Sequence, residues 1–186
     1  MQVCEVDFLV CGGPTWLMGP PGQGFVYCRQ ELQDELIPPC AGYVSVASEE
    51  GLRDRDVSTA QASARDARQL ELSRGNTVGQ VGLLAAVRFL MEVGISTVER
   101  WTLHLTELLI EDMRRRGYET TSNVHPSRRS AIVAFNVPKD VNRALDRLTE
   151  ARVVVSKYDQ CIHVSPHCYN TEEEIARVGE VLGDAA

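Results

Sequence analysis

The chain has 186 residues, of which 44% are hydrophobic and 24% charged, and its formal net charge is -7. This length suffices for one full domain with a sizeable core, and no apolar run approaches the ~20 residues that span a bilayer. Binding to phosphates requires a basic face, so the acidic balance argues against a nucleic-acid partner. The opening residues 1–10 lack the basic start of a secretory signal, and we therefore expect a cytoplasmic location and no membrane segment.

The first predicted elements are two short strands around a loop rich in glycine and proline. Residues 7–11 and 24–28 are apolar runs, and PTWLMGPP lies between them. Residues 33–66 mix proline, glycine and serine with scattered charge, and only YVSVA at 43–47 resembles a strand. We expect a long surface connection there.

Helical periodicity begins at residue 78. Apolar side chains recur at helical spacing over 78–93 and again over 96–116. Gly94 marks a break between these helices, and Gly117 marks the end of the second.

The remaining chain predicts the order β-α-β-β-α. Strands are expected within 130–137, 152–158 and 161–165, a helix after Pro138, and a final helix over 170–182. Thr171 supplies an N-cap for that last helix, and acidic residues fill its first turn. This order indicates a small open-faced α/β sandwich.

Six cysteines without a C-x-x-C spacing predict reduced, mostly buried thiols. The run CIHVSPHC raises the question of zinc, because Cys161 and His163 share a strand face and His167 with Cys168 would complete a tetrad. It lacks the short knuckle of structural zinc sites. Strand and turn packing is the simpler interpretation, and we predict no metal.

The N-terminal segment has a distinctive set of residues around its two strands and their loop. They are Asp7, Phe8, Trp16, Gly19, Pro20, Gly22, Gly24, Tyr27 and Arg29. With these residues the segment resembles the cofactor-lysine segment of class V aminotransferases. This family of pyridoxal phosphate (PLP) enzymes has fold type I and includes cysteine desulfurases, cysteine lyases and isopenicillin N epimerase-like proteins. Residues 70–101 and 153–178 are similar to later segments of the same family.

The resemblance implies an α/β fold built from the C-terminal portion of a PLP-transferase large domain and the small C-terminal α/β sandwich domain. Residues 1–75 would be the remnant of the large cofactor-binding domain, and residues 76–186 the long helices and the small domain. A family member has about twice this length, and no segment resembles the family's glycine-rich phosphate loop. Two strands without the rest of their sheet would expose apolar surface, so we expect a homodimer or a companion chain to cover them.

Thr15 occupies the position of the family's lysine, which links the cofactor covalently and moves the substrate's alpha proton. Threonine has no amine, and the two lysines of the chain, Lys139 and Lys157, lie outside this loop. Rescue by Lys157 is the remaining route to a covalent link. The resemblance therefore implies PLP as cofactor, while the residues predict that it is not covalently bound.

Other candidate cofactor contacts are Ser73 and Arg74, which align with the Gly-Thr pair that meets the phosphate in the family, and Trp16. Ser73 and Arg74 retain a hydroxyl and a cation, so an anion could still bind there.

The strand arginines that bind the substrate carboxylate in the family align with Tyr158, Cys161 and His163. An imidazole lacks the permanent charge and the forked donors of arginine. We therefore doubt substrate binding of the family kind, although a small amino-acid-like ligand stays open. Together with His167 these residues are the candidate acid/base groups, with ordinary strand packing as the alternative for His163.

Three functional interpretations remain open at this stage. The chain is a degenerate or truncated class V protein that has lost catalysis, a repurposed enzyme that works without PLP, or one subunit of a split two-chain enzyme. Whether it is an enzyme at all is left undecided by the sequence.

Overall fold

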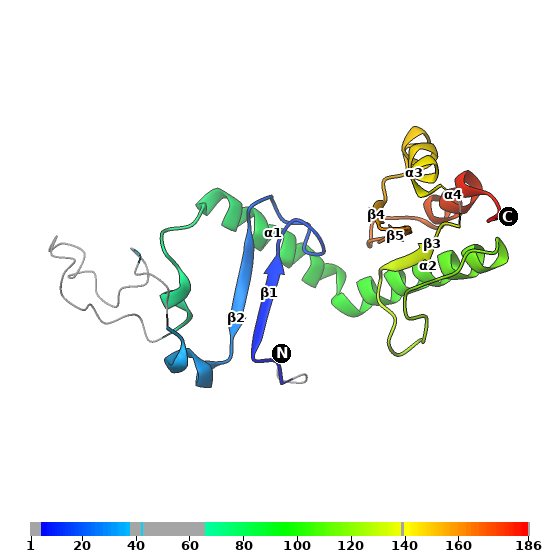
Figure 1. Ribbon diagram of the computed structural model, residues 1–186. Helices are drawn as coiled ribbons and strands as arrows, with labels where there is room; N and C mark the ends of the chain where they lie inside the picture. The colour runs from blue at the N-terminus through cyan, green and yellow to red at the C-terminus, as the bar shows by residue number, and fades with distance from the viewer. Residues whose placement is uncertain (1–4, 38–41, 43–65, 139, 186) are drawn as a thin grey trace, which may run out of the picture. The chain divides into compact units, whose positions relative to one another are not determined.

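The computed structural model describes residues 5–37, 42, 66–138 and 140–185 (Figure 1). Two compact units divide the chain, Met1–Leu90 and Met91–Ala186. The predicted domain portions, 1–75 and 76–186, remain a prediction. The strand expected at 43–47 lies outside the described residues.

The first unit is built on an antiparallel hairpin, as predicted. Strand β1 (Phe8–Gly12) pairs with β2 (Gly24–Cys28), in a register that runs from Phe8 opposite Cys28 to Gly12 opposite Gly24 (Figure 1). At the open end of the hairpin, Arg29 Nε lies 3.1 Å from Asp7 Oδ1. This ion pair joins two of the residues that carry the family resemblance.

Three helical segments follow the hairpin in the described part of this unit. They are the 3-10 helices η2 (Gln30–Glu35) and η4 (Ala67–Leu70), which periodicity did not predict, and α1 (Thr77–Val93). The buried side chain of Gln69 donates to the carbonyl of Gln33 over 2.6 Å and so joins η4 to η2.

Glycines allow a close approach where the loop between β1 and β2 meets α1. A Cβ on Gly19 would lie 2.8 Å from Leu83 Cδ1, and one on Gly82 would lie 3.0 Å from Pro20 Cγ. A side chain at either position would have to displace its neighbour, so glycine lets the loop lie against the helix.

The second unit confirms the predicted β-α-β-β-α order after a long helix. Its elements are α2 (Ile95–Arg115), β3 (Val133–Asn136), α3 (Val141–Glu150), β4 (Ser156–Tyr158), β5 (Cys161–Val164) and α4 (Glu172–Leu182). The sheet is antiparallel with the order β3-β5-β4.

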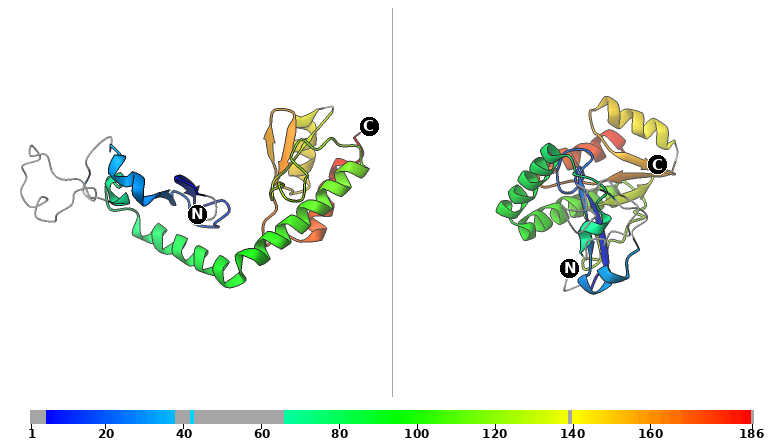
Figure 2. Two further views of the ribbon diagram at one scale, coloured as in Figure 1. Left: turned by 90° about the horizontal axis from the view of Figure 1, so that it is seen from below. Right: turned by 90° about the vertical axis from the view of Figure 1, so that its left-hand side faces the viewer.

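One face of this sheet packs against the helices and forms the core. In the left view of Figure 2, α4 lies alongside α2, and the two helices are in contact. Strand residues with the opposite parity point away from the core. The side chains that are fully buried are Phe135, Leu105, Leu109, Met113, Leu148, Ile162, Val133 and Thr106.

The final helix begins where the sequence predicts. Thr171 Oγ1 accepts from the backbone N–H of Glu174, whose carboxylate in turn accepts from the backbone N–H of Thr171, which is a capping box. The hydrogen bonds from the Asn170 amide and the Thr171 backbone hold the pKa of Glu174 below its usual range.

The strand predicted over 152–158 is shorter than expected and begins only at Ser156. The chain first closes α3 with Arg152 in the left-handed region, at φ 60°. The backbone N–H of Val153 donates to Leu148, and that of Arg152 donates to Thr149, at 2.8 and 2.9 Å. These two bonds form a Schellman motif, which occupies the residues that were expected to start the strand.

The thiols are free in the described residues, but the prediction that they are mostly buried is wrong there. Cys28 is buried, whereas Cys11, Cys161 and Cys168 are partly exposed because they lie on strand faces or in a turn outside the core. Within the described chain no single helix is long and apolar enough to cross a membrane, and α1 and α2 meet that test only when counted together as a broken pair.

Candidate functional site

The first candidate region is the loop that carries Thr15 between β1 and β2. Backbone hydrogen bonds fold it: Gly13 donates to Gln23 over 2.7 Å, and Gly19 donates to Gly13 over 2.8 Å. Met18, at φ 53°, donates to the carbonyl of Thr15 over 3.0 Å. The loop thus presents the Thr15 side chain to solvent on a tight turn.

The other residues predicted to contact the cofactor are exposed in the same unit. Trp16 follows Thr15 in the turn and is 37% exposed. Ser73 and Arg74 lie in the segment between η4 and α1. Just beyond them, Asn76 Oδ1 accepts from the backbone N–H of Gly79 over 3.1 Å, which caps the start of α1.

The second candidate region is the face of the three-stranded sheet that points away from the core. Tyr158 on β4 lies opposite Cys161 on β5, and His163 lies two residues further on the same face. The rings of Tyr158 and His163 are 6.1 Å apart, at an interplanar angle of 46°. The structure therefore brings these three predicted residues together.

Two residues that the sequence analysis missed adjoin this group. Asn136 on β3 lies opposite Cys161, and Thr121 Oγ1 lies 3.8 Å from Cys161 Sγ. Thr121 is 40 residues away in sequence. The preceding residue, Thr120, forms an isolated β-bridge with Phe135. No short-range sequence pattern predicts the contact between Thr121 and Cys161.

His167 lies between β5 and α4, outside the strands that carry Tyr158, Cys161 and His163. It is buried, and its backbone N–H donates to Asn170 Oδ1 over 2.8 Å. Its ring stacks on Tyr169 with 5.0 Å between centroids, and its Nδ1 lies 3.2 Å from Cys168 Sγ. In the described residues no group of three or more His, Cys, Asp or Glu could hold a metal ion.

The described residues place no primary amine in the loop that carries Thr15. Thr15 offers a hydroxyl, and Lys157, the one lysine in the described chain, belongs to the other unit and donates from Nζ to Asn142 Oδ1 over 2.6 Å. Lys139 lies outside the described residues.

The known proteins that are similar in sequence to this chain come from one enzyme family. The sequence model described as "Aminotransferase class-V" matches residues 1–178. A probable cysteine desulfurase of Methanothermobacter thermautotrophicus is 27% identical over the whole chain and 49% of its own length. The isopenicillin N epimerase of Amycolatopsis lactamdurans is also 27% identical, over 95% of this chain and 46% of its own length.

Solved structures resemble the chain in fold. The apo cysteine desulfurase from Thermococcus onnurineus superimposes with a TM-score of 0.83 over 97% of this chain and 47% of its own, at 22% identity. A cystine C-S lyase in complex with cysteine persulfide gives a TM-score of 0.82 at 20% identity. The chain spans about half the length of the curated relatives it matches. The predicted α/β fold of the PLP-transferase type is confirmed.

Proposed function

The chain belongs to the class V aminotransferase family, and we propose that it is a member that no longer links PLP covalently and so does not perform the family's amino-acid chemistry by itself. The observation that carries this proposal is Thr15. Thr15 supports the proposal because it aligns, by resemblance, with the family's lysine, and because the loop presents it to solvent on a tight turn. A hydroxyl cannot form an imine with an aldehyde, whereas a primary amine can.

A spectrophotometric titration with PLP tests the proposal. The wild-type chain should develop no visible imine absorbance, and borohydride should leave no cofactor attached to it. The same titration of Thr15→Lys asks whether the loop can present an amine to the cofactor, with Thr15→Gln as a control of similar length that has no amine. Cofactor fixed by borohydride to any side chain of the wild-type protein, Lys157 included, would overturn the proposal.

A second function, as one subunit of a two-chain assembly, is favoured by the hairpin. Phe8, Val10 and Val26 are 48%, 76% and 50% exposed on one face of the hairpin, which forms a sheet of two strands in the described chain. An isolated two-stranded hairpin is marginal in water, and clustered apolar surface marks an interaction site. A homodimer or a companion chain in the cytoplasm would cover these side chains.

Sedimentation equilibrium of the wild type and a Val10→Thr, Val26→Thr double variant tests this second function. Both residues lie opposite one another on the same face of the hairpin, so threonine keeps the β-branched shape while removing apolar surface. We expect the double variant to associate more weakly. A wild-type chain that is monomeric at every concentration, alone and with a co-expressed large-domain half, would refute it.

A repurposed enzyme that works without PLP is supported by the contact between Tyr158 and His163. Against it, Tyr158 is 75% exposed, and neither residue lines the cavity of about 470 Å3 in this unit. An open face does not exclude water from reacting groups. If Tyr158→Phe and His163→Ala leave the protein's biosynthetic activity unchanged, this third function fails.

A further inference from the structure

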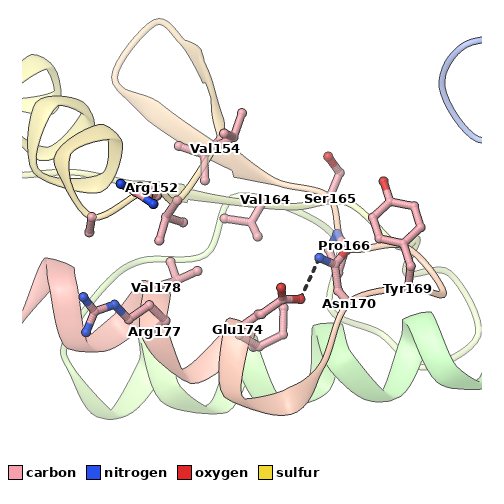
Figure 3. Close-up of a pocket in the computed structure, with 14 residues that line it drawn as sticks. Arg152, Val154, Val164, Ser165, Pro166, Tyr169, Asn170, Glu174, Arg177 and Val178 are labelled. Carbon is pink, nitrogen blue, oxygen red and sulfur yellow. Dashed lines mark hydrogen bonds between the residues drawn. The ribbon is translucent and has the colours of Figure 1, made fainter.

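The second unit contains a cavity of about 470 Å3 that none of the candidate residues above lines (Figure 3). In the close-up, the side chains of Arg152 and Arg177 lie toward one end, Asn170 and Tyr169 toward the other, and Val164 between them. This volume falls within the ~300–1,000 Å3 of small-molecule sites.

The cavity opens where two neighbouring strands separate. Strand β4 pairs with β5 from Ser156 opposite His163 to Tyr158 opposite Cys161, and the pairing goes no further. In the described chain no backbone hydrogen bond joins residues 153–155 to residues 164–166. Pro166 has no backbone N–H to donate, which is one reason the ladder ends there.

The walls between the two ends of the cavity are aliphatic. Three consecutive valines, 153–155, line it from one strand end, and Val164 and Val178 line it from β5 and α4. Val154 is 97% exposed. An aliphatic ligand body in this cavity would remove such surface from water.

Arg152 occupies a backbone position at which glycine is usual. It is the left-handed residue of the Schellman motif that follows α3. The corresponding residue after α2 is Gly117, which has φ 84° and the same pair of backbone hydrogen bonds. A side chain at such a position costs about 1 kcal/mol relative to glycine. The sequence nevertheless places a guanidinium there, at the edge of the cavity.

The charges that line the cavity favour an anion. The Arg152 guanidinium has no hydrogen-bond or ion-pair partner in the described chain, and Arg177 has only a long contact of 3.5 Å with Glu180. Glu174 is the one carboxylate in the lining. One of its oxygens already accepts hydrogen bonds from the Asn170 amide and the Thr171 backbone N–H. This carboxylate therefore serves to cap α4.

We propose that this cavity binds a small carboxylate with an aliphatic body, with its anionic end held by Arg152 and Arg177 and its body against the valines. Guanidinium groups bind carboxylates through paired, charge-assisted hydrogen bonds. The site lies wholly within the second unit and requires neither Thr15 nor PLP, so it goes beyond the function proposed above.

Titration of the full chain with octanoate, followed by the NMR signals of valine methyl groups, tests the site. We expect saturable shifts of Val154, Val164 and Val178, with a dissociation constant on the order of millimolar. Octanamide has the same body without the charge and should bind about tenfold more weakly, because it cannot form the charge-assisted bonds.

Arg152→Gly separates binding from folding. Glycine suits the left-handed backbone, so this variant should be at least as stable as the wild type while binding octanoate about tenfold more weakly. Arg177→Gln should weaken binding to a similar degree. Arg114→Gln, at an exposed site in the last turn of α2, is the control that should leave binding unchanged.

Three results would overturn the proposal. One is an absence of saturable shifts when the octanoate concentration is ten times the expected dissociation constant. Another is equal binding of octanoate and octanamide, because the arginines would then not contact the anion. The third is an equal loss of affinity in Arg114→Gln and Arg152→Gly, because attraction would then come from the general charge of the protein.

Discussion

Two leucines on α3 provide a matched test of the core of the second unit. Leu148 has no exposed surface, whereas Leu145, one turn earlier on the same helix, is only partly buried. Replacing either leucine by alanine changes helix propensity equally, so that contribution cancels in the comparison. The difference between the variants then reports burial alone.

The expected loss at Leu148 combines two contributions. Removing a fully buried leucine side chain forfeits its transfer free energy, about 1.5–3 kcal/mol, and leaves a cavity that its neighbours fill incompletely. Together these lower the free energy of unfolding by about 3–4 kcal/mol. The partly buried Leu145 should lose about 1 kcal/mol.

Urea unfolding followed by tryptophan fluorescence measures this difference. The chain has two tryptophans, Trp16 and Trp101, one in each unit. In a Trp16→Phe background only Trp101 reports, and its Nε1 donates to the carbonyl of Asn170 over 3.1 Å, which links α2 to the segment before α4. Equal losses in Leu145→Ala and Leu148→Ala, or a loss below about 1.5 kcal/mol at Leu148, would refute the packing described above.

Further predictions concern the N-cap of α4, the buried phenol of Tyr118, and Arg147, which donates to the C-terminal end of α4. Thr171→Ala should lower the free energy of unfolding of the second unit by about 1 kcal/mol in the same fluorescence assay, and Thr171→Ser should restore most of it because the hydroxyl acceptor returns. Burial raises the pKa of Tyr118, so its contribution to stability is complete below the unfolded value near ~10 and is lost as the pH rises through the higher folded value. Unfolding at alkaline pH should therefore depend less on pH in Tyr118→Phe, and an unchanged slope would contradict this. Arg147 Nη1 donates to the carbonyl of Leu182 over 3.2 Å at the end of α4, so Arg147→Met should destabilise by about 1–2 kcal/mol in urea.

Elements with a strong period were predictable from sequence, and those that depend on a local turn were not. The hairpin and the two long helices begin within a few residues of their predicted limits because apolar spacing determines which side chains are buried. The strand before Ser156 was predicted too long because valines 153–155 have high strand propensity. The end of α3 overrode that propensity by placing Arg152 in a left-handed conformation, which no periodicity reveals.

The candidate site shows the same limit. Alternation along a strand correctly placed Cys161 and His163 on one face, and the pairing of β4 with β5 added Tyr158. His167 seemed to belong with them because it lies close in sequence. The chain leaves the sheet after Val164, and the backbone N–H of His167 donates to Asn170 Oδ1 in the segment between β5 and α4. Thr121 was missed because its contact with Cys161 depends on tertiary structure.

The geometry of the loop that carries Thr15 makes Thr15→Lys a test of chemistry rather than of folding. The turn is held by the carbonyl of Thr15, which accepts from Met18, and by the backbone of Gly13 and Gly19. The Thr15 side chain is exposed and makes no hydrogen bond within the described chain. A lysine there would therefore remove no hydrogen bond, and its stem can extend into water. Surface substitutions of this kind change stability by less than about 0.5 kcal/mol. A folded Thr15→Lys protein that still fails to react with PLP would therefore indicate that the loop does not present an amine to the cofactor, whereas a reactive one would indicate that it does.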